Sequence, residues 1–95
     1  MGPRYVRLLE EIDRRGSIRE ACARIGLSYR TCLNRIRQME RVLGHRVILT
    51  TRGGASGGGS ELTEEARDLV RLYRAWRAEL ERASDDLFRR LRRHG

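Results

Sequence analysis

The sequence contains no lysine, so all 21 of its strongly basic residues are arginine. Its 13 acidic residues leave a formal net charge of +8 at pH 7. Such an excess of positive charge favours an anionic partner, which is nucleic acid, an acidic membrane surface or an acidic protein. Aromatic residues make up only 5% of the 95 residues. The chain is therefore expected to form one small domain with a mostly aliphatic core.

Cysteine is scarce, and the two cysteines do not form a metal-binding motif. Cys22 and Cys32 are ten residues apart, without a CxxC pair. A structural zinc site needs about four ligands, and His45 and His94 are poorly spaced to complete one. We therefore expect two buried free thiols, no metal and no cofactor.

Long apolar runs are also missing. No apolar stretch approaches the roughly 20 residues of a membrane span, and "MGPRYVRLLEEID" is too charged for a signal peptide. We expect a cytoplasmic, nucleoid-associated protein with no membrane partner. Glu10, Glu11 and Asp13 lie near no nucleophile or metal motif, so we interpret them as a solvated face and predict no enzymatic activity.

Three short helices are predicted, over Pro3–Arg15, Ile18–Ile25 and Tyr29–Leu43. In each, apolar residues recur at intervals of three and four, and a glycine follows the last residue. Ser17 and Glu20 form a capping box at the start of the second helix, and Ser28 caps the third.

The period changes after the third helix. Residues 46–50 are rich in β-branched side chains and indicate a strand, and "SELT" (60–63) is its expected return partner. The run "RGGASGGGSELT" (52–63) holds five of the ten glycines. We interpret the glycine-rich part, 52–60, as the tip of a hairpin rather than as a linker.

A fourth helix of about 28 residues is predicted to begin after Thr63, with a weak point at 84–86. At 1.5 Å per residue it would reach about 42 Å, which is longer than so small a domain can cover. Its apolar residues alternate by three and four and form a seam typical of helix pairing. We therefore predict a homodimer, whose interface residues are Leu69, Tyr73, Trp76, Leu80, Ala83 and Leu87.

The second and third helices have the features of a helix-turn-helix. Small residues, Ala21 and Cys22, allow a close crossing, and Gly26 permits a tight turn. The face of the third helix opposite its apolar stripe carries three arginines, the only Asn and the only Gln of the chain, and no carboxylate: Arg30, Thr31, Asn34, Arg37, Gln38 and Arg41. A hairpin directly afterwards makes this the winged form.

The stretch "GSIREACARIGLSYRTCLNRIRQMERVLG" resembles the N-terminal DNA-binding segment of LysR-type regulators. It is more similar still to the molybdate-responsive ModE regulators, through "GSI", "GLSYRT" and the glycine-rich "TTRGGASGGGSELT". The similarity covers about residues 8–76. It implies a winged-helix dimer, joined by the long helix, on a two-fold operator. The molybdate-binding domains of ModE have no counterpart here, so the chain resembles a stand-alone DNA-binding half, and molybdate sensing does not carry over.

The expected fold is mainly α: a winged helix-turn-helix over 1–63 and a dimerisation helix over 64–95, in one folded unit. The expected function is sequence-specific regulation of transcription on a pseudo-palindromic duplex, with the recognition helix Ser28–Leu43 in the major groove and the wing on the backbone or minor groove. The predicted DNA contacts are Ser17, Ser28, Tyr29, Arg30, Thr31, Asn34, Arg35, Gln38, Arg52, Gly53, Gly54, Ser56, Gly57 and Gly58.

Two other functions remain open at this point: an architectural DNA-binding protein with little sequence preference, and an interaction module for an acidic protein. Asn34 and Gln38 favour the sequence-specific reading, because both side chains can form two hydrogen bonds with adenine. The sequence does not identify the operator, or a ligand or second protein that controls activity.

Overall fold

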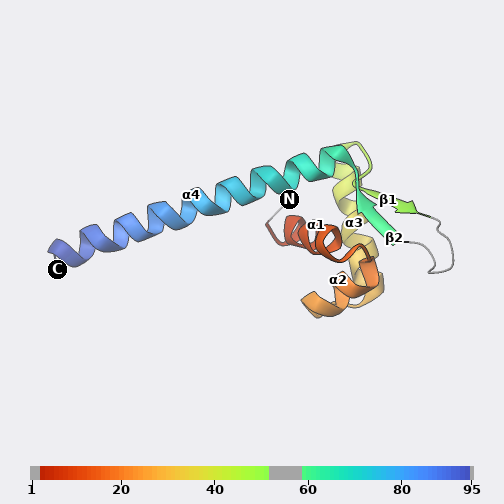
Figure 1. Ribbon diagram of the computed structural model, residues 1–95, viewed down its shortest axis with the longest axis horizontal. Coiled ribbons are helices and arrows are strands. Elements are labelled where there is room, and N and C mark those ends of the chain that lie inside the picture. Colours follow the sequence, from red (N-terminus) through yellow and green to blue (C-terminus); the bar gives the residue numbers. More distant parts are fainter. Residues whose placement is uncertain (1–2, 52–58, 95) are drawn as a thin grey trace.

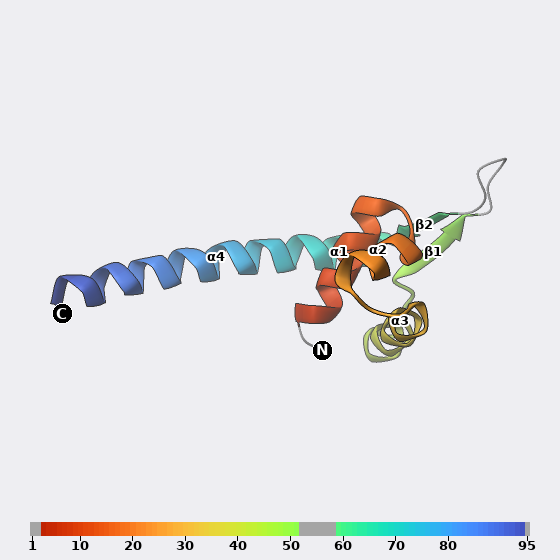
Figure 2. The same cartoon turned by 90° about the horizontal axis from the view of Figure 1, so that it is seen from below.

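The computed structural model describes residues 3–51 and 59–94. This part of the chain folds into α1 (Pro3–Arg15), α2 (Ile18–Ile25), α3 (Tyr29–Leu43), β1 (Ile48–Thr51), β2 (Gly59–Leu62) and α4 (Glu64–His94). The first turns of α4 lie along one edge of the domain, against α1 and β2, and the rest of α4 extends away from it (Figures 1 and 2). The molecule therefore measures 61 × 27 × 21 Å. The expected winged helix-turn-helix with a long helix is confirmed.

The start of each helix of the helix-turn-helix is fixed by a serine. Ser17 Oγ accepts the backbone N–H of Glu20 at 3.2 Å, and Ser28 Oγ accepts that of Thr31 at 3.2 Å. These bonds satisfy N–H groups that have no partner inside the helix. Between the two helices Gly26 has φ 86°, a left-handed conformation that glycine adopts without steric cost. Both predicted caps and the predicted turn are confirmed.

The hydrophobic core lies where the three short helices, the sheet and the base of α4 meet. Its side chains are almost all aliphatic, as the low aromatic content predicts. The buried apolar residues are Val6, Leu8, Leu9, Ile12, Ile18, Ala21, Cys22, Cys32, Ile36, Met39, Val47, Ile48, Leu62, Ala66 and Val70. Because Ala66 and Val70 belong to this core, the first two turns of α4 are anchored to the domain.

The two strands form an antiparallel pair in which Ile48 faces Leu62 and Thr51 faces Gly59. β1 begins two residues later than predicted. Just before it, the N–H of Val47 donates to Glu40 Oε2 at 2.9 Å, and the carbonyl of Arg46 accepts from Thr63 Oγ1 at 2.9 Å. The Val47 carbonyl still accepts the N–H of Thr63, the residue opposite it, at 3.0 Å. The two side-chain bonds tie the base of the hairpin to α3 and to the start of α4, and they take up backbone groups that a longer β1 would use.

α4 is one continuous helix of 31 residues, so its length is about 46 Å. Its first turn is capped as predicted, since Thr63 Oγ1 accepts the Ala66 N–H at 3.2 Å. The predicted weak point at 84–86 does not interrupt it. Ion pairs Arg82–Glu79 and Arg89–Asp86 flank this segment at helical spacing, which supports the helix there.

The interpretation of Glu10 and Glu11 as a solvated face is wrong, because their exposed fractions are only 5% and 8%. Glu10 Oε2 accepts a hydrogen bond from Arg74 Nε at 2.8 Å and lies 3.6 Å from Arg77 Nη2. Glu10 lies on a second face of α1, which contacts α4. The apolar stripe of α1 does not include this face, so the pattern of apolar residues did not reveal it.

The expectation of two free thiols is also corrected. The Sγ atoms of Cys22 and Cys32 are joined as a disulfide that links α2 to α3, with the two Cα atoms 6.3 Å apart. Sequence separation alone did not predict this pairing. The crossing of the two helices brings the cysteines together, because both are placed at their mutual contact.

The Glu10 contacts predict a pH-dependent contribution to stability. Burial alone raises the pKa of Glu10, but the Arg74 hydrogen bond and the charges of Arg77, Arg74 and Arg14 outweigh it, so the pKa falls below its ordinary value of 4.5. A carboxyl whose pKa is lower in the folded state stabilises the fold above its unfolded pKa, and this contribution is lost as the pH falls through the folded value.

We therefore expect Glu10→Gln to lower the free energy of unfolding at pH 7 by about 1.5–3 kcal/mol, the range for a hydrogen bond to a charged group. Urea denaturation from pH 7 to pH 3 measures it, and the difference from the wild type should shrink below about pH 4.5. Glu81→Gln, on the exposed part of α4, is the control and should change little. A difference that stays constant across this range would contradict the role of the ion pair.

Candidate nucleic-acid interface

The exposed face of α3 carries positive charge that no neighbouring acid balances. Within residues 3–51 and 59–94, the ion pairs involve arginines of α1 and α4, and none involves the four arginines of α3. The one acidic residue of α3, Glu40, is turned inward, where its carboxylate accepts the Val47 N–H. α3 therefore offers a surface that attracts an anion at close range.

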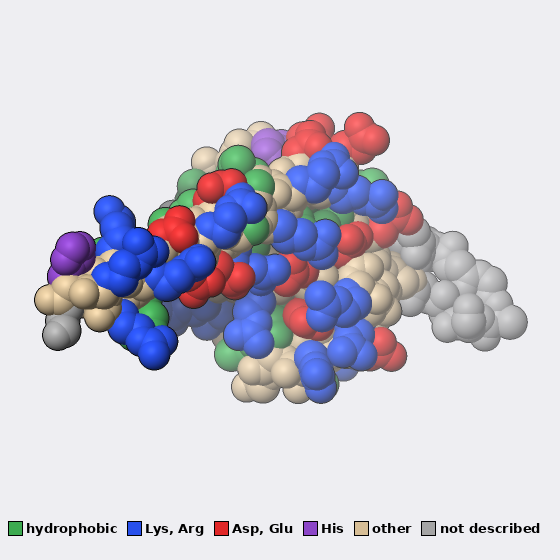
Figure 3. All heavy atoms as spheres, turned by 60° about the vertical axis from the view of Figure 1, so that its left-hand side comes forward, with side chains coloured by type: hydrophobic (Ala, Val, Ile, Leu, Met, Phe, Trp, Pro, Cys, Tyr) green, Lys and Arg blue, Asp and Glu red, His purple; other side chains and the backbone are tan. Residues whose placement is uncertain are grey.

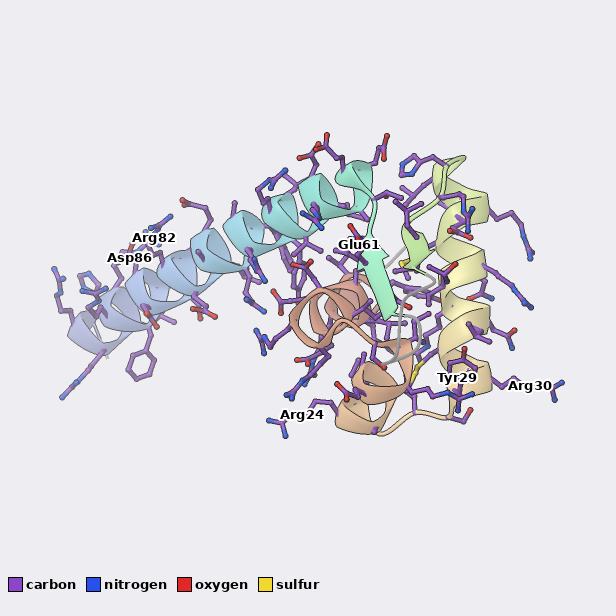
Figure 4. The ribbon with its side chains drawn as sticks, turned by 45° about the vertical axis from the view of Figure 1, so that its right-hand side comes forward. Arg24, Tyr29, Arg30, Glu61, Arg82 and Asp86 are labelled. Carbon is purple, nitrogen blue, oxygen red and sulfur yellow. A yellow bond between two sulfur atoms is a disulfide. The ribbon has the colours of Figure 1, made fainter. Side chains whose placement is uncertain are left out.

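The outward-facing residues of α3 separate into two groups. Arg30, Asn34, Arg37 and Arg41 are exposed and lie opposite the buried Cys32, Ile36 and Met39. Arg30 points away from the body of the protein (Figure 4). Four of the six residues predicted for this face from helical spacing lie on it, whereas Gln38 belongs to the second group and Thr31 is half-buried in the first turn. An α-helix with such a face has the dimensions that the major groove of B-DNA admits.

The second group lies on the flank of α3 that faces α1. Tyr5 Oη donates a hydrogen bond to Gln38 Oε1 at 3.0 Å, and the Arg35 guanidinium lies 5.7 Å from the centre of the Tyr5 ring. Sequence reasoning missed Tyr5, because its position in the apolar stripe of α1 assigned it to the core. Tyr5 is in fact half-buried at the surface, where it orders two of the predicted contact residues.

The first turn of α3 is organised by its own side chains. The Ser28 hydroxyl accepts the Thr31 N–H and donates its hydrogen to Thr31 Oγ1 at 2.8 Å. Ser28 is thus occupied within the helix, whereas the hydroxyl hydrogen of Thr31 is left to donate. Tyr29 is on a different side of the helix from Asn34, and the Arg19 guanidinium of α2 lies 4.3 Å from the centre of its ring. Sequence reasoning missed Arg19, which no local pattern indicates.

The remaining predicted contacts lie at the edges of this surface or beyond the described residues. Ser17 is half-buried at the start of α2, where its side chain caps the helix. The predicted wing contacts, which are Arg52, Gly53, Gly54, Ser56, Gly57 and Gly58, lie outside the described residues. At the base of the wing Glu61 is exposed (Figure 4) and pairs with Arg67 at 3.6 Å.

The predicted interface residues of α4 change from half-buried to exposed along the helix. Leu69 and Tyr73 pack against the core, whereas Trp76, Leu80 and Leu87 are 47%, 52% and 50% exposed. Leu72, Phe88 and Leu91 add to the apolar surface of the same helix. Arginines and acids alternate along α4 in Figure 3, and arginines gather at its C-terminal end. So much exposed apolar surface on one helix is typical of an interaction site.

The described residues contain no group of three or more His, Cys, Asp or Glu side chains that would hold a metal ion. None of the described helices is long and apolar enough to cross a membrane.

A family model covers most of this surface. Residues 3–67 match the model described as "Bacterial regulatory helix-turn-helix protein, lysR family". The match includes α1 to α3, both strands and the start of α4. The chain therefore belongs to the LysR family of bacterial regulatory helix-turn-helix proteins.

Named relatives agree with this family. The chain is 38% identical over 86 residues to the molybdenum transport protein ModE of Azotobacter vinelandii, a match that covers 90% of this chain and 32% of that protein. It is 34% identical over 71 residues to the DNA-binding transcriptional dual regulator ModE of Escherichia coli K12, covering 75% of this chain and 27% of that protein. The chain thus spans about a third or less of the length of these relatives.

Solved structures show the same fold. The CbnR DNA-binding domain in complex with DNA superposes with a TM-score of 0.69 at 21% identity, covering 90% of this chain and 93% of that one. The BenM DNA-binding domain on the benA site 1 DNA gives a TM-score of 0.71 at 16% identity, covering 94% of each chain. At these identities the likeness concerns the fold, which is the winged helix-turn-helix.

Proposed function

We propose that this protein is a sequence-specific transcriptional regulator that binds double-stranded DNA as a homodimer. The observation that carries the proposal is the outer face of α3, where arginines with no acidic partner among the described residues surround Asn34, the only asparagine of the chain. The membership of the LysR family and the relative described as a DNA-binding transcriptional dual regulator support it.

In this proposal α3 enters the major groove with its N-terminal half, as recognition helices do. Arg30, Thr31 and Asn34 then approach base edges. An asparagine can both donate to and accept from adenine, and an arginine can donate two bonds to guanine. Arg37 and Arg41, further along the same face, are placed for phosphates. The wing, 52–60, is proposed to lie on the backbone or in the minor groove, where glycines let backbone N–H groups approach phosphate.

The dimer is proposed to form along α4. Only the first turns of this helix are buried by the domain, so the apolar side chains from Trp76 to Leu91 need another partner. Its charge is uneven: Glu64 and Glu65 open the helix, and Arg92 and Arg93 end it. A second copy running antiparallel would place unlike charges side by side, whereas a parallel copy would bring the arginine-rich ends together.

The two alternatives make different demands on α3. An architectural protein needs phosphate contacts alone, so an asparagine at the centre of the face would have no part in its binding. A docking module for an acidic protein would use the same arginines without any preference for duplex DNA. Binding experiments with defined duplexes therefore separate all three.

The proposal predicts the outcome of selection from a random duplex pool. We expect the full chain to enrich one sequence with two-fold symmetry, whose half-sites are about one helical turn, or a multiple of it, apart. Retention of duplex without enrichment would support the architectural alternative. No retention at low salt would support the acidic protein partner and would refute DNA binding.

Asn34→Ala tests the reading of bases. We expect it to weaken binding to the selected sequence by about 1–3 kcal/mol and to relax preference at one or two positions, because a base edge loses its hydrogen bonds. Titrations on selected and random duplexes measure the effect. Arg24→Ala, whose side chain points away from α3 in Figure 4, is the control. An equal loss on both duplexes would show that Asn34 does not read sequence.

Leu80→Asp tests the dimer. A charge at the middle of the apolar seam would be buried without a partner, so we expect the mass in solution to fall from twice 11.1 kDa to 11.1 kDa at micromolar concentration. Light scattering measures the mass, and circular dichroism confirms that the domain stays folded. Ala78→Asp, about half a helical turn away on the exposed side, should remain dimeric. A monomeric wild type would contradict the proposal.

A further inference from the structure

The flank of α3 that faces α1 holds a group of side chains that the base-reading face does not include. Tyr5 comes from α1, and Arg35 and Gln38 come from α3. The three are connected by the Tyr5 Oη to Gln38 Oε1 bond of 3.0 Å and by the stacking of Arg35 over the Tyr5 ring at 5.7 Å. Beside them is an open hollow of about 310 Å³, lined by Tyr5, Gln38, Met39, Arg41 and Val42.

The direction of the hydrogen bond decides what this group can offer to a partner. A carboxamide has one acceptor oxygen and an NH₂ group with two donors. Because Tyr5 donates to the oxygen of Gln38, the amide is held with that oxygen toward α1. Its NH₂ group remains for a partner, and the arginines beside it, Arg35 and Arg41, are donors only. The free hydrogen-bonding capacity of the group is therefore dominated by donors.

A surface made of donors fits a ligand atom that only accepts. A phosphate oxygen is such an atom, and the guanidinium of arginine matches it well. Reading adenine is a poorer fit, because the Tyr5 hydrogen bond holds Gln38 Oε1 toward α1, whereas a bidentate contact needs both the oxygen and the NH₂ group to face the base. The position of the group on the flank of α3 also favours phosphate over a base, because the flank of a helix in the major groove faces the sugar–phosphate strand at the groove's edge.

We propose that Tyr5, Arg35 and Gln38 form a phosphate-binding site at the edge of the DNA interface, in which Tyr5 is a positioning residue that orients the Gln38 amide. This inference rests on the proposed function. It assigns Gln38 to the DNA backbone and leaves base reading to the outer face around Asn34. It also gives α1, outside the helix-turn-helix, a part in DNA binding.

Tyr5→Phe is the decisive variant, because it removes one hydroxyl and keeps the ring that packs and stacks. We expect Tyr5→Phe and Gln38→Ala each to weaken binding by about 2- to 12-fold, the range of one hydrogen bond, and by the same factor on selected and random duplexes. The double variant should bind no worse than Gln38→Ala alone, because Tyr5 acts through Gln38. Gln38→Glu should bind worst of all, since its carboxylate repels phosphate.

Arg35→Ala completes the test through salt. Loss of one phosphate contact lowers the slope of log affinity against log salt by about one. Arg82→Ala is the control, because it removes the same charge from the distal part of α4 (Figure 4). It should lower the slope of log affinity against log salt by less.

Three results would overturn the inference while leaving the proposed function intact: wild-type affinity in Tyr5→Phe, a full additive loss in the double variant, or a change of preference at one base pair in Gln38→Ala. Failure of the proposed function is a separate result, because the wild type itself would then not bind duplex DNA.

Discussion

The ion pair between Glu10 and the two arginines of α4 fixes how the long helix leaves the domain. Apolar contacts at Ala66 and Val70 hold the first turns of α4, but they end where the core ends. Arg74 and Arg77 lie one and two turns further along, and both are directed to the buried carboxylate of Glu10 in α1. A buried charge tolerates few geometries, because it needs its partners at hydrogen-bonding distance. The direction of α4 relative to α1, and hence to α3, depends on this contact.

The distribution of ion pairs divides the arginines of the chain into two populations. Those of α4 are largely paired with acids three residues away in the helix, with Glu61 or with Glu10. Those of α3 have no acid beside them within the described residues. The net charge of +8 is thus unevenly spread, and the excess at α3 belongs to the surface that the fold leaves open. Composition alone predicted an anionic partner, and the pairing pattern supports α3 as the proposed place for it.

The helices were predictable from sequence because the signals that fix them are local. Ser17, Ser28 and Gly26 act within four residues of their own position, and the bounds of α1 to α3 agree with the structure. What the sequence did not reveal depends on contacts between distant segments. Glu10 meets Arg74 across 64 positions, and Tyr5 meets Gln38 across 33. β1 begins late because the side chains of Thr63 and Glu40, 17 and seven residues away, use the backbone of residues 46 and 47.

For the candidate site, too, the local features were predictable from sequence and the contacts between distant segments were not. The outer face of α3 follows from the period of the helix, once its buried stripe is known, so Arg30 and Asn34 lie where they were expected. Gln38 belongs to the same face on a helical wheel, yet its environment is set by a tyrosine of another helix. Whether a polar side chain donates or accepts toward a partner depends on which of its atoms the protein has already used.

The length of α4 has a mechanical consequence. Beyond Arg74, α4 extends about 30 Å further to its C-terminal end, so a tilt of about 10° at the Glu10 contact would displace its tip by about 5 Å. The stiffness of that one attachment therefore sets how accurately anything joined to the far end is positioned relative to α3. In a protein with a long helical arm, the buried carboxylate that holds the arm contributes to its orientation as well as to stability.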